Sequence, residues 1–289
     1  MSPYNKPEFV SIRLKATFLI VISLLLLSAC NELCQPVQPY LVLYAFGAEG
    51  ELMAQNMEAA KCDTLLGHKV YMGRLSGKNV VLAESGVGMT NAAMTAQMMI
   101  DKYHPKGVIF SGIAGAIDTL VHIGDIAIAE KWVTHEYGYY GKNGFVPSEL
   151  EVYFPRVDSI AAVTYLDVDS GLFSKAGRLI TERISLDSVG NRVPKVIVGG
   201  IGASGNSFID QVEKRLWLSE KFRALTVDME SAAVAQVCTA NNVPFIIFRS
   251  ASDLAGGSGS ESARVEIDEF FEVAAGNSAK VVMRFIESL

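Results

Sequence analysis

The stretch VDMESAAVAQVCTANNVPFIIFRSASDLAGG, residues 227–257, joins an apolar helix to an apolar strand and places acids at both ends. Small apolar residues at helical spacing predict a helix over Met229–Ala240, and the aromatic and β-branched run predicts a buried strand over Phe245–Arg249. Acids that bracket such a unit indicate a polar site on a rigid frame. These acids are Asp228, Glu230 and Asp253.

Strand and helix patterns alternate along the rest of residues 40–289, which predicts one α/β domain with a central sheet flanked by helices. The predicted strands are Tyr40–Phe46, Val70–Leu75, Asn79–Glu84, Gly107–Phe110, Asp125–Val133 and Val196–Ile201. The predicted helices are Thr90–Tyr103, Phe208–Trp217 and Val265–Ile286. Between Thr134 and Lys195 the pattern is weaker, and we expect a tyrosine- and glycine-rich loop or flap followed by helices over Ser159–Leu166 and Ser174–Arg183.

The N-terminal residues have the pattern of a secretion signal, with basic residues ahead of the apolar run Ala16–Leu27. This run is shorter than the about 20 residues that span a bilayer as a helix. Its ending resembles a bacterial lipoprotein signal, in which Cys30 is lipidated; ordinary signal cleavage and a permanent membrane helix are the alternatives. We expect a signal peptide over residues 1–29, a tether over 30–39, and an exported protein that is periplasmic or anchored to the membrane by its lipid.

Charge and cysteine usage exclude several classes of function. The formal net charge is −6, and the predicted signal holds three of the 25 basic residues, so nucleic acid is not an expected partner. The four cysteines form no CxxC pair and the histidines no cluster, so neither a disulfide framework nor a metal site is expected. Cys238, inside an apolar helix, is predicted to be buried.

Four glycine-containing turns are predicted to follow strands, where the ligand crevice of an open α/β sheet lies. They are Phe46–Glu49, Ser85–Gly88, Ser111–Gly115 and Ser252–Gly256. The second turn lacks the third glycine of a dinucleotide fingerprint, because Asn91 stands there. A small-molecule site that binds no dinucleotide is therefore favoured.

Five segments share their residues and order with one family. Besides the opening stretch they are AFGAEGEL (45–52), VYMGRLSGKNVVLAESGVGMTNAA (70–93), SGIAGAIDTLVHIGDIAIAE (111–130) and GNSFI (205–209). Together they resemble the nucleoside phosphorylase and nucleosidase superfamily, and within it the 5′-methylthioadenosine/S-adenosylhomocysteine nucleosidases. GIAG and SDLAGG look like a secreted branch that includes plant bark storage proteins. The resemblance implies a three-layer fold with a mixed sheet, no cofactor, and a homo-oligomer, with a dimer favoured.

Cleavage of an N-glycosidic bond needs an acid near the base, a group that activates water, and anchors on the ribose hydroxyls. The resemblance assigns the acid to Asp253, water activation to Glu49 with Arg249, and the ribose hydroxyls to Glu230 with help from Asp228. The alternatives are helix caps for the aspartates, a solvated first-turn acid for Glu230 and a structural ion pair for Arg249.

The remaining binding residues also follow from the resemblance. Phe208 would stack on the purine, the Ile209 backbone would read its edge, and Met229 would pack on the sugar; as sequence alone, the first two fit a helix core equally well. The glycine-containing turns add Ser85, Gly86, Gly112, Ile113 and Ser252. Tyr137 and Tyr139 are weaker candidates for a lid.

The acid-rich first turn, with Glu49 and Glu51, favours water over phosphate as the nucleophile, and Glu51 is expected at the surface. We therefore expect hydrolysis of a purine nucleoside similar to 5′-methylthioadenosine or S-adenosylhomocysteine, with release of adenine. A phosphorylase, with Arg74 as a candidate phosphate ligand, and a non-catalytic nucleoside-binding or storage-like protein are the alternatives. Ile113 and Asn206 depart from residues common in the cytosolic enzymes, which leaves the 5′ substituent open.

Overall fold

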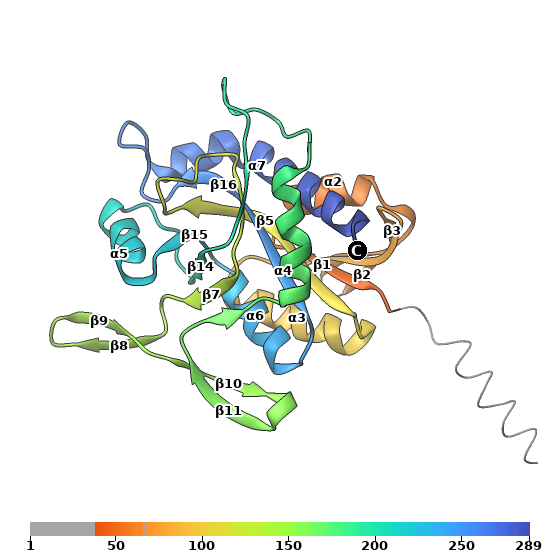
Figure 1. Cartoon of the computed structure of the whole chain (residues 1–289), viewed down its shortest axis with the longest axis horizontal. Helices are drawn as coiled ribbons and strands as arrows, with labels where there is room; N and C mark the ends of the chain where they lie inside the picture. Colours follow the sequence, from red (N-terminus) through yellow and green to blue (C-terminus); the bar gives the residue numbers. More distant parts are fainter. Residues whose placement is uncertain (1–37, 66) are drawn as a thin grey trace, which may run out of the picture. The chain divides into compact units, whose positions relative to one another are not determined.

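A computed structural model describes residues 38–65 and 67–289. The predicted signal peptide, Cys30 and the tether up to residue 37 lie outside this part. One 12-stranded sheet runs through the described residues, with helices on both faces (Figure 1). The α/β prediction is thereby confirmed.

The sheet is mixed. Its main path runs in the order β12 (Leu166–Asp167), β7 (Lys131–Thr134), β14 (Ile201–Ser204), β15 (Ala224–Asp228), β5 (Gly107–Ala116), β1 (Tyr40–Tyr44), β4 (Lys78–Glu84), β3 (His68–Leu75) and β2 (Glu58–Leu65). Off this path, β16 (Phe245–Leu254) pairs with β5 and with β6 (Ile126–Ile128), which in turn pairs with β13 (Val196–Val198). Neighbours of β1 are parallel to it, whereas β3 and β15 run antiparallel to β4 and β5.

Alternate side chains of β1 pack against different helical layers, because successive side chains of a strand point to opposite faces of the sheet. Leu41 and Leu43 pack in one cluster with α3 (Met89–Tyr103) and α6 (Ser231–Ala240). Val42 packs on the opposite face. The helices of that face are α2 (Gly47–Gln55), α4 (Ser170–Ala176) and α7 (Ala263–Glu287).

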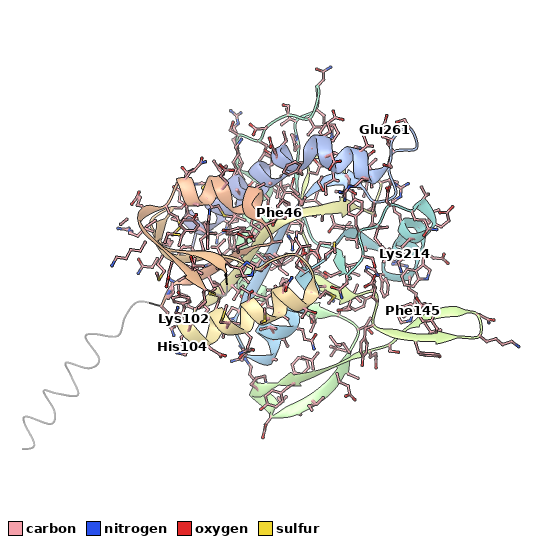
Figure 2. The ribbon with its side chains drawn as sticks, turned by 180° about the vertical axis from the view of Figure 1, so that it is seen from behind. Phe46, Lys102, His104, Phe145, Lys214 and Glu261 are labelled. Atoms are coloured by element: carbon pink, nitrogen blue, oxygen red, sulfur yellow. The ribbon has the colours of Figure 1, made fainter. Side chains whose placement is uncertain are left out.

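A smaller layer lies over the other end of the sheet. Leu218 and Phe222 of α5 (Val212–Phe222) pack on Ala203 and Ala224. The hairpin of β8 (Gly138–Gly141) and β9 (Gly144–Pro147) starts nearby, and its Phe145 lies 6.2 Å from Trp217 of α5, between ring centroids. Figure 2 labels Phe145 on this hairpin and Lys214 on α5.

The topology brings the candidate residues to one edge. β1 leads directly into α2, and β5 and β16 lie side by side with Gly112 opposite Arg249. β15 ends at Asp228, one residue after Val227 pairs with Gly115 of β5. The ends of β1, β5, β15 and β16 therefore lie close together at one edge of the sheet.

Most predicted elements next to the site are confirmed within a few residues, but two strands are longer than expected. The predicted turns Ser111–Gly115 and Ser252–Gly256 are largely strand, since β5 and β16 remain paired up to Ala116 and Leu254. The helix α2, which starts inside the first predicted turn, was not predicted.

Other predicted elements have wrong bounds. The single strand expected over Asp125–Val133 is split into β6 and β7, which pair with different neighbours. The strand expected over Val196–Ile201 is interrupted by Gly199 and Gly200, whose φ angles of 117° and 76° suit glycine. The helix expected over Phe208–Trp217 begins only at Val212.

The weakly patterned region contains the largest error. Ser159–Leu166 is not a helix: β11 (Ser159–Val163) pairs with β10 (Leu150–Phe154), and this hairpin buries Val152 against the core cluster that contains α6. The helix expected over Ser174–Arg183 starts earlier, because Asp169 caps α4 by accepting the Leu172 N–H at 2.8 Å, and a 3₁₀ turn over Gly177–Thr181 follows. No described helix is long and apolar enough to cross a membrane.

Candidate active site

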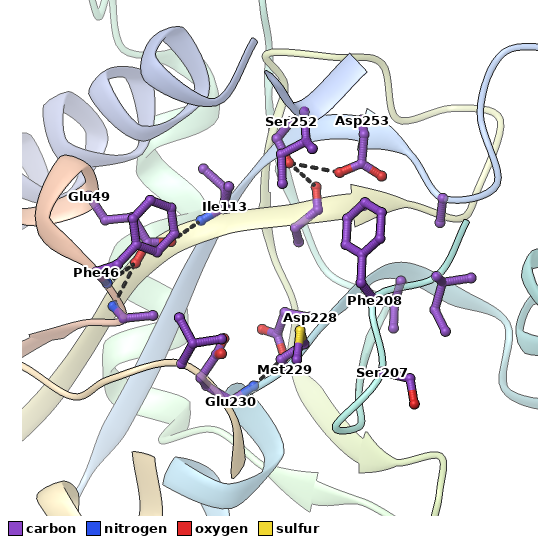
Figure 3. Close-up of a pocket in the computed structure, with 18 residues that line it drawn as sticks. Phe46, Glu49, Ile113, Ser207, Phe208, Asp228, Met229, Glu230, Ser252 and Asp253 are labelled. Carbon is purple, nitrogen blue, oxygen red and sulfur yellow. Dashed lines mark hydrogen bonds between the residues drawn. The ribbon is translucent and has the colours of Figure 1, made fainter. Parts of the chain in front are cut away.

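A cavity of about 150 Å³ opens at the edge where β1, β5, β15 and β16 end. Figure 3 shows acids on two sides of it, with Glu49 on one side and Asp253 on the other. Nine of the predicted site residues line this cavity: Glu49, Ile113, Phe208, Ile209, Asp228, Met229, Glu230, Ser252 and Asp253.

Arg249 lies behind the cavity and organises its acids. The guanidinium is fully buried, and its carbon stacks 4.1 Å from the centroid of the Phe110 ring. It forms ion pairs with three carboxylates: Nε–Oδ2 of Asp228 at 2.7 Å, Nη2–Oε2 of Glu230 at 3.5 Å and Nη1–Oε1 of Glu49 at 3.8 Å. Burial disfavours its charge, but these three acids outweigh burial and raise the pKa of Arg249.

Gly112 makes room for this arrangement on the neighbouring strand. A Cβ at this position would collide with Nη1 of Arg249 and lie 2.5 Å from Oε1 of Glu49. The space beside β5 is thus filled by the ion pair instead of a side chain. Gly112 does not line the cavity itself and contributes by the absence of a side chain.

Glu49 is held in the first turn of α2 with 1% of its side chain exposed. Its Oε2 accepts the N–H groups of Ala45 at 2.6 Å and Phe46 at 3.4 Å, and Oε1 accepts the Ile113 N–H at 2.8 Å. Burial raises the pKa of this carboxyl group, against the lowering effects of Arg249 and the backbone donors. Its neighbour Glu51 is exposed, as predicted.

Asp228 anchors the start of α6. Its Oδ1 accepts the Ser204 hydroxyl at 2.6 Å and the N–H groups of Ser231 at 3.1 Å and Glu230 at 3.2 Å, and its Oδ2 accepts the Ser231 hydroxyl. Together with its ion pair to Arg249, these bonds occupy both oxygens. Asp228 therefore combines the predicted place at the cavity with the alternative capping role.

Glu230 is 5% exposed, which contradicts a solvated first-turn acid. Its Oε1 accepts the Gly88 N–H at 2.8 Å, which ties α6 to the turn before α3. Burial raises the pKa of Glu230 to about 7, with Arg249 acting in the opposite direction and Asp228 adding to the rise.

Asp253 has a different environment. Its side chain is 1% exposed, its Oδ2 accepts the Ser252 hydroxyl at 2.8 Å, and its Oδ1 has no hydrogen-bond partner among the described residues. Burial raises the pKa of this carboxyl group to about 7. The helix that follows is capped by Ser262, so Asp253 is not a cap.

The structure also corrects the extent of the site. Ser85 and Gly86 do not reach the cavity wall, where the same turn places Val87. The Ser85 hydroxyl donates to the Gly86 carbonyl at 3.1 Å, so this pair shapes the turn. Ile267 of α7 lines the cavity too, and the strand-end pattern gave no signal for it.

The described residues provide no metal site, and the two tyrosines considered as a lid lie away from the cavity. Among the described residues, no group of three or more His, Cys, Asp or Glu side chains has the arrangement of a metal site. Tyr137 and Tyr139 are exposed and do not line the cavity. Cys238 is buried, as predicted.

Fold and site together define an α/β protein whose acid-lined cavity suits a small ligand with polar and apolar parts. The chain belongs to the Phosphorylase superfamily, whose family model matches residues 39–287.

Individual proteins are similar to this chain over most of its length. The chain is 33% identical over 227 residues to a 5′-methylthioadenosine/S-adenosylhomocysteine nucleosidase of Staphylococcus epidermidis, covering 76% of this chain and 87% of the relative. The Neisseria meningitidis nucleosidase of the same name, solved with methylthio-immucillin-A, has a TM-score of 0.70 at 28% identity and covers 88% of this chain and 100% of that one. Futalosine hydrolase of Helicobacter pylori has a TM-score of 0.71 at 26% identity, with 88% and 99% covered.

Proposed function

We propose that this protein hydrolyses the N-glycosidic bond of a purine nucleoside similar to 5′-methylthioadenosine or S-adenosylhomocysteine and releases adenine. The observation that carries this proposal is the division of buried carboxyl groups across one cavity. Glu49 and Glu230 share Arg249, whereas Asp253 has no cation beside it among the described residues. Relatives named for this activity support the proposal.

The roles of the acids follow from these environments. Asp253, with a pKa raised to about 7, holds its proton below about pH 7 and donates it to the purine as the bond between sugar and base breaks. Glu49 accepts a proton from the attacking water, with Arg249 holding the local charge. Glu230 accepts hydrogen bonds from ribose hydroxyls, and Phe208 stacks on the base.

Water is the proposed nucleophile because the described residues offer the cavity no free cation. None of the described residues that line it is Lys or Arg, and Arg249 already pairs with three carboxylates. Arg74, the candidate phosphate ligand, is exposed and donates from Nη2 to the Gly77 carbonyl at 3.0 Å. A phosphate dianion in this cavity would face acids without compensation.

The test is turnover of 5′-methylthioadenosine, S-adenosylhomocysteine, adenosine and inosine, each with and without phosphate, with bases and sugars separated by chromatography. We expect free adenine and unphosphorylated sugar from 5′-methylthioadenosine and S-adenosylhomocysteine in both buffers. Sugar phosphate would mean a phosphorylase. Calorimetric binding of a nucleoside with no product would mean a binding or storage-like protein.

We also propose that the protein acts as a homo-oligomer, with a dimer favoured. The β8–β9 hairpin projects from the body in Figure 1 and exposes Tyr139, Tyr140 and Val146, with Tyr137 beside it. Exposed aromatic side chains of this kind suit a protein interface. Light scattering would give a dimer mass, and replacement of Tyr140 by Asp would weaken it; a monomer at all concentrations would contradict this proposal.

We further propose that the protein is exported and anchored to a membrane by a lipid. A lipid on Cys30 would hold the protein at a membrane, and the substrate would then be a nucleoside or thioether outside the cytosol. The signal pattern over residues 1–29 supports it.

A further inference from the structure

Glu266 is a buried acid outside the cavity wall that the proposed mechanism does not use. It lies in the first turn of α7, with 5% of its side chain exposed. Its Oε2 accepts the N–H of Leu254 at 2.8 Å, and its Oε1 accepts the N–H of Ser258 at 2.9 Å. One carboxylate oxygen therefore binds the last residue of β16, directly after Asp253, and the other binds the loop that joins β16 to α7.

This loop contributes to the cavity wall and contacts the segment beside it. Ala255 lines the cavity, and the Gly256 N–H donates to the Ile209 carbonyl at 3.0 Å, which ties the loop to the segment that carries Phe208. Asp210 accepts the Ala263 N–H at 2.8 Å from the other side. Gly256 has a φ of 90°, so the turn that permits this contact suits glycine.

The charges that face Asp253 are of one sign. After burial, the groups that raise its pKa are Glu266 on α7 and Asp210 on the loop before α5, and the Ser252 hydroxyl acts in the opposite direction. The buried cation of the site, Arg249, pairs with the other acids instead. The fold thus places the positive charge of Arg249 beside Glu49, Asp228 and Glu230, and negative charge beside Asp253, the proposed proton donor.

We infer that Glu266 is a positioning residue for the proposed hydrolysis: its charge adds to burial in holding the proton on Asp253, and its two hydrogen bonds fix the end of β16 and the loop that follows it. In each turnover the Asp253 proton passes to the purine ring as the bond electrons go to the base, and water gives its proton to Glu49. Asp253 is then a carboxylate facing Glu266 and Asp210, which favours its reprotonation from solvent, while Glu49 returns its proton to solvent. The inference rests on the proposed function.

The first test is the pH dependence of kcat/KM for adenine release. Glu266→Gln keeps the size and removes the charge, so the alkaline limb should move down by about one pH unit, with about a tenfold loss at pH 8.5 and less than about a twofold loss at pH 5.5. Glu266→Asp is the matched control, because it keeps the charge but shortens the reach to both N–H groups. It should lower activity without moving the limb, and an equal loss at every pH for Glu266→Gln would overturn the inference.

A second test does not depend on turnover. Carboxyl-carbon NMR of the full chain labelled with ¹³C-aspartate follows the titration of Asp253 directly, with Asp253→Asn to assign its signal. Glu266→Gln should lower this titration midpoint by about one pH unit, and Asp210→Asn should lower it less. Unchanged midpoints in both variants would overturn the inference. A lowered midpoint in a protein that cleaves no nucleoside would uphold the coupling of Glu266 to Asp253 and reject the proposed function alone.

Discussion

At the scale of single residues, the acids of the cavity differ in the groups that contact them. Glu49 and Asp253 are almost equally buried, yet one contacts Arg249 and three backbone donors and the other a single hydroxyl. Burial raises the pKa of both carboxyl groups; Arg249 opposes the rise at Glu49, whereas no described cation opposes it at Asp253. Two acids in one small cavity are in this way prepared for opposite proton transfers.

Replacement of Glu49 by Gln is expected to lower kcat by about 100-fold or more, because the amide cannot take a proton from water. Glu51→Gln is the matched control two residues away. Its side chain is exposed and only accepts from Nε2 of Gln55 at 3.1 Å, so its steady-state kinetics should equal those of the unchanged protein. Equal losses in both variants would remove Glu49 from the mechanism.

The raised pKa of Asp253 also predicts a pH-dependent effect on stability. Since the folded pKa is about 7 and the ordinary value is 3.8, the folded state binds this proton more tightly than the unfolded chain does. The resulting stability is fully present below about pH 4 and is lost as the pH rises through about 7. Asp253→Asn should therefore be more stable than the unchanged protein by about 2–4 kcal/mol at pH 8 and show little gain at pH 4. Urea unfolding at both pH values measures this, and an equal difference at both would contradict it.

The sequence predicts the acids better than it predicts their surroundings. Spacing and resemblance place Glu49, Glu230 and Asp253 around one cavity, where the structure has them. The sequence does not indicate that Arg249 joins Glu49 and Glu230 to Asp228, because their pairing depends on strands far apart in the chain. No sequence pattern indicates Glu266, because its partners are the last residue of β16 and a residue of the loop that follows.

At the scale of elements, the close pairing of β5 and β16 fixes the site. Gly112→Ala is expected to cost about 2 kcal/mol or more in stability and most of the activity, because its Cβ would displace Arg249 from Glu49. Gly276→Ala on α7 is the matched control: a Cβ there meets no atom within 4 Å, and alanine favours the helix by up to about 1 kcal/mol. Thermal unfolding and adenine release measure both. An active, stable Gly112→Ala variant would contradict this description of the site.

The periodic elements were predictable and the pairing-dependent ones were not. The helices α3 and α7 and the strands β1, β3 and β4 follow from spacing alone. In contrast, the residues of β11 form a strand only because β10 lies beside them, and the lengths of β5 and β16 come from their mutual pairing. Tertiary context decides such segments.

At the scale of the whole molecule, the proposed lipid on Cys30 makes a prediction for cell fractionation. The unchanged protein should sediment with membranes, and Cys30→Ala should appear in the soluble fraction, because the covalent lipid is the proposed anchor. Cys34→Ala is the matched control and should leave the distribution unchanged. Membrane retention of Cys30→Ala would point to an uncleaved apolar segment instead.

Adenine release from 5′-methylthioadenosine in phosphate-free buffer, measured from pH 5.5 to 8.5 for the unchanged protein and for Asp253→Asn, tests the central claim most directly. Asp253→Asn should be slower by about 10²–10⁴-fold, since the amide donates no proton to the base. The unchanged protein should lose kcat/KM above about pH 7, where Asp253 ionises. Adenine release by Asp253→Asn at the unchanged rate, or a strict need for phosphate, would contradict the proposed hydrolysis.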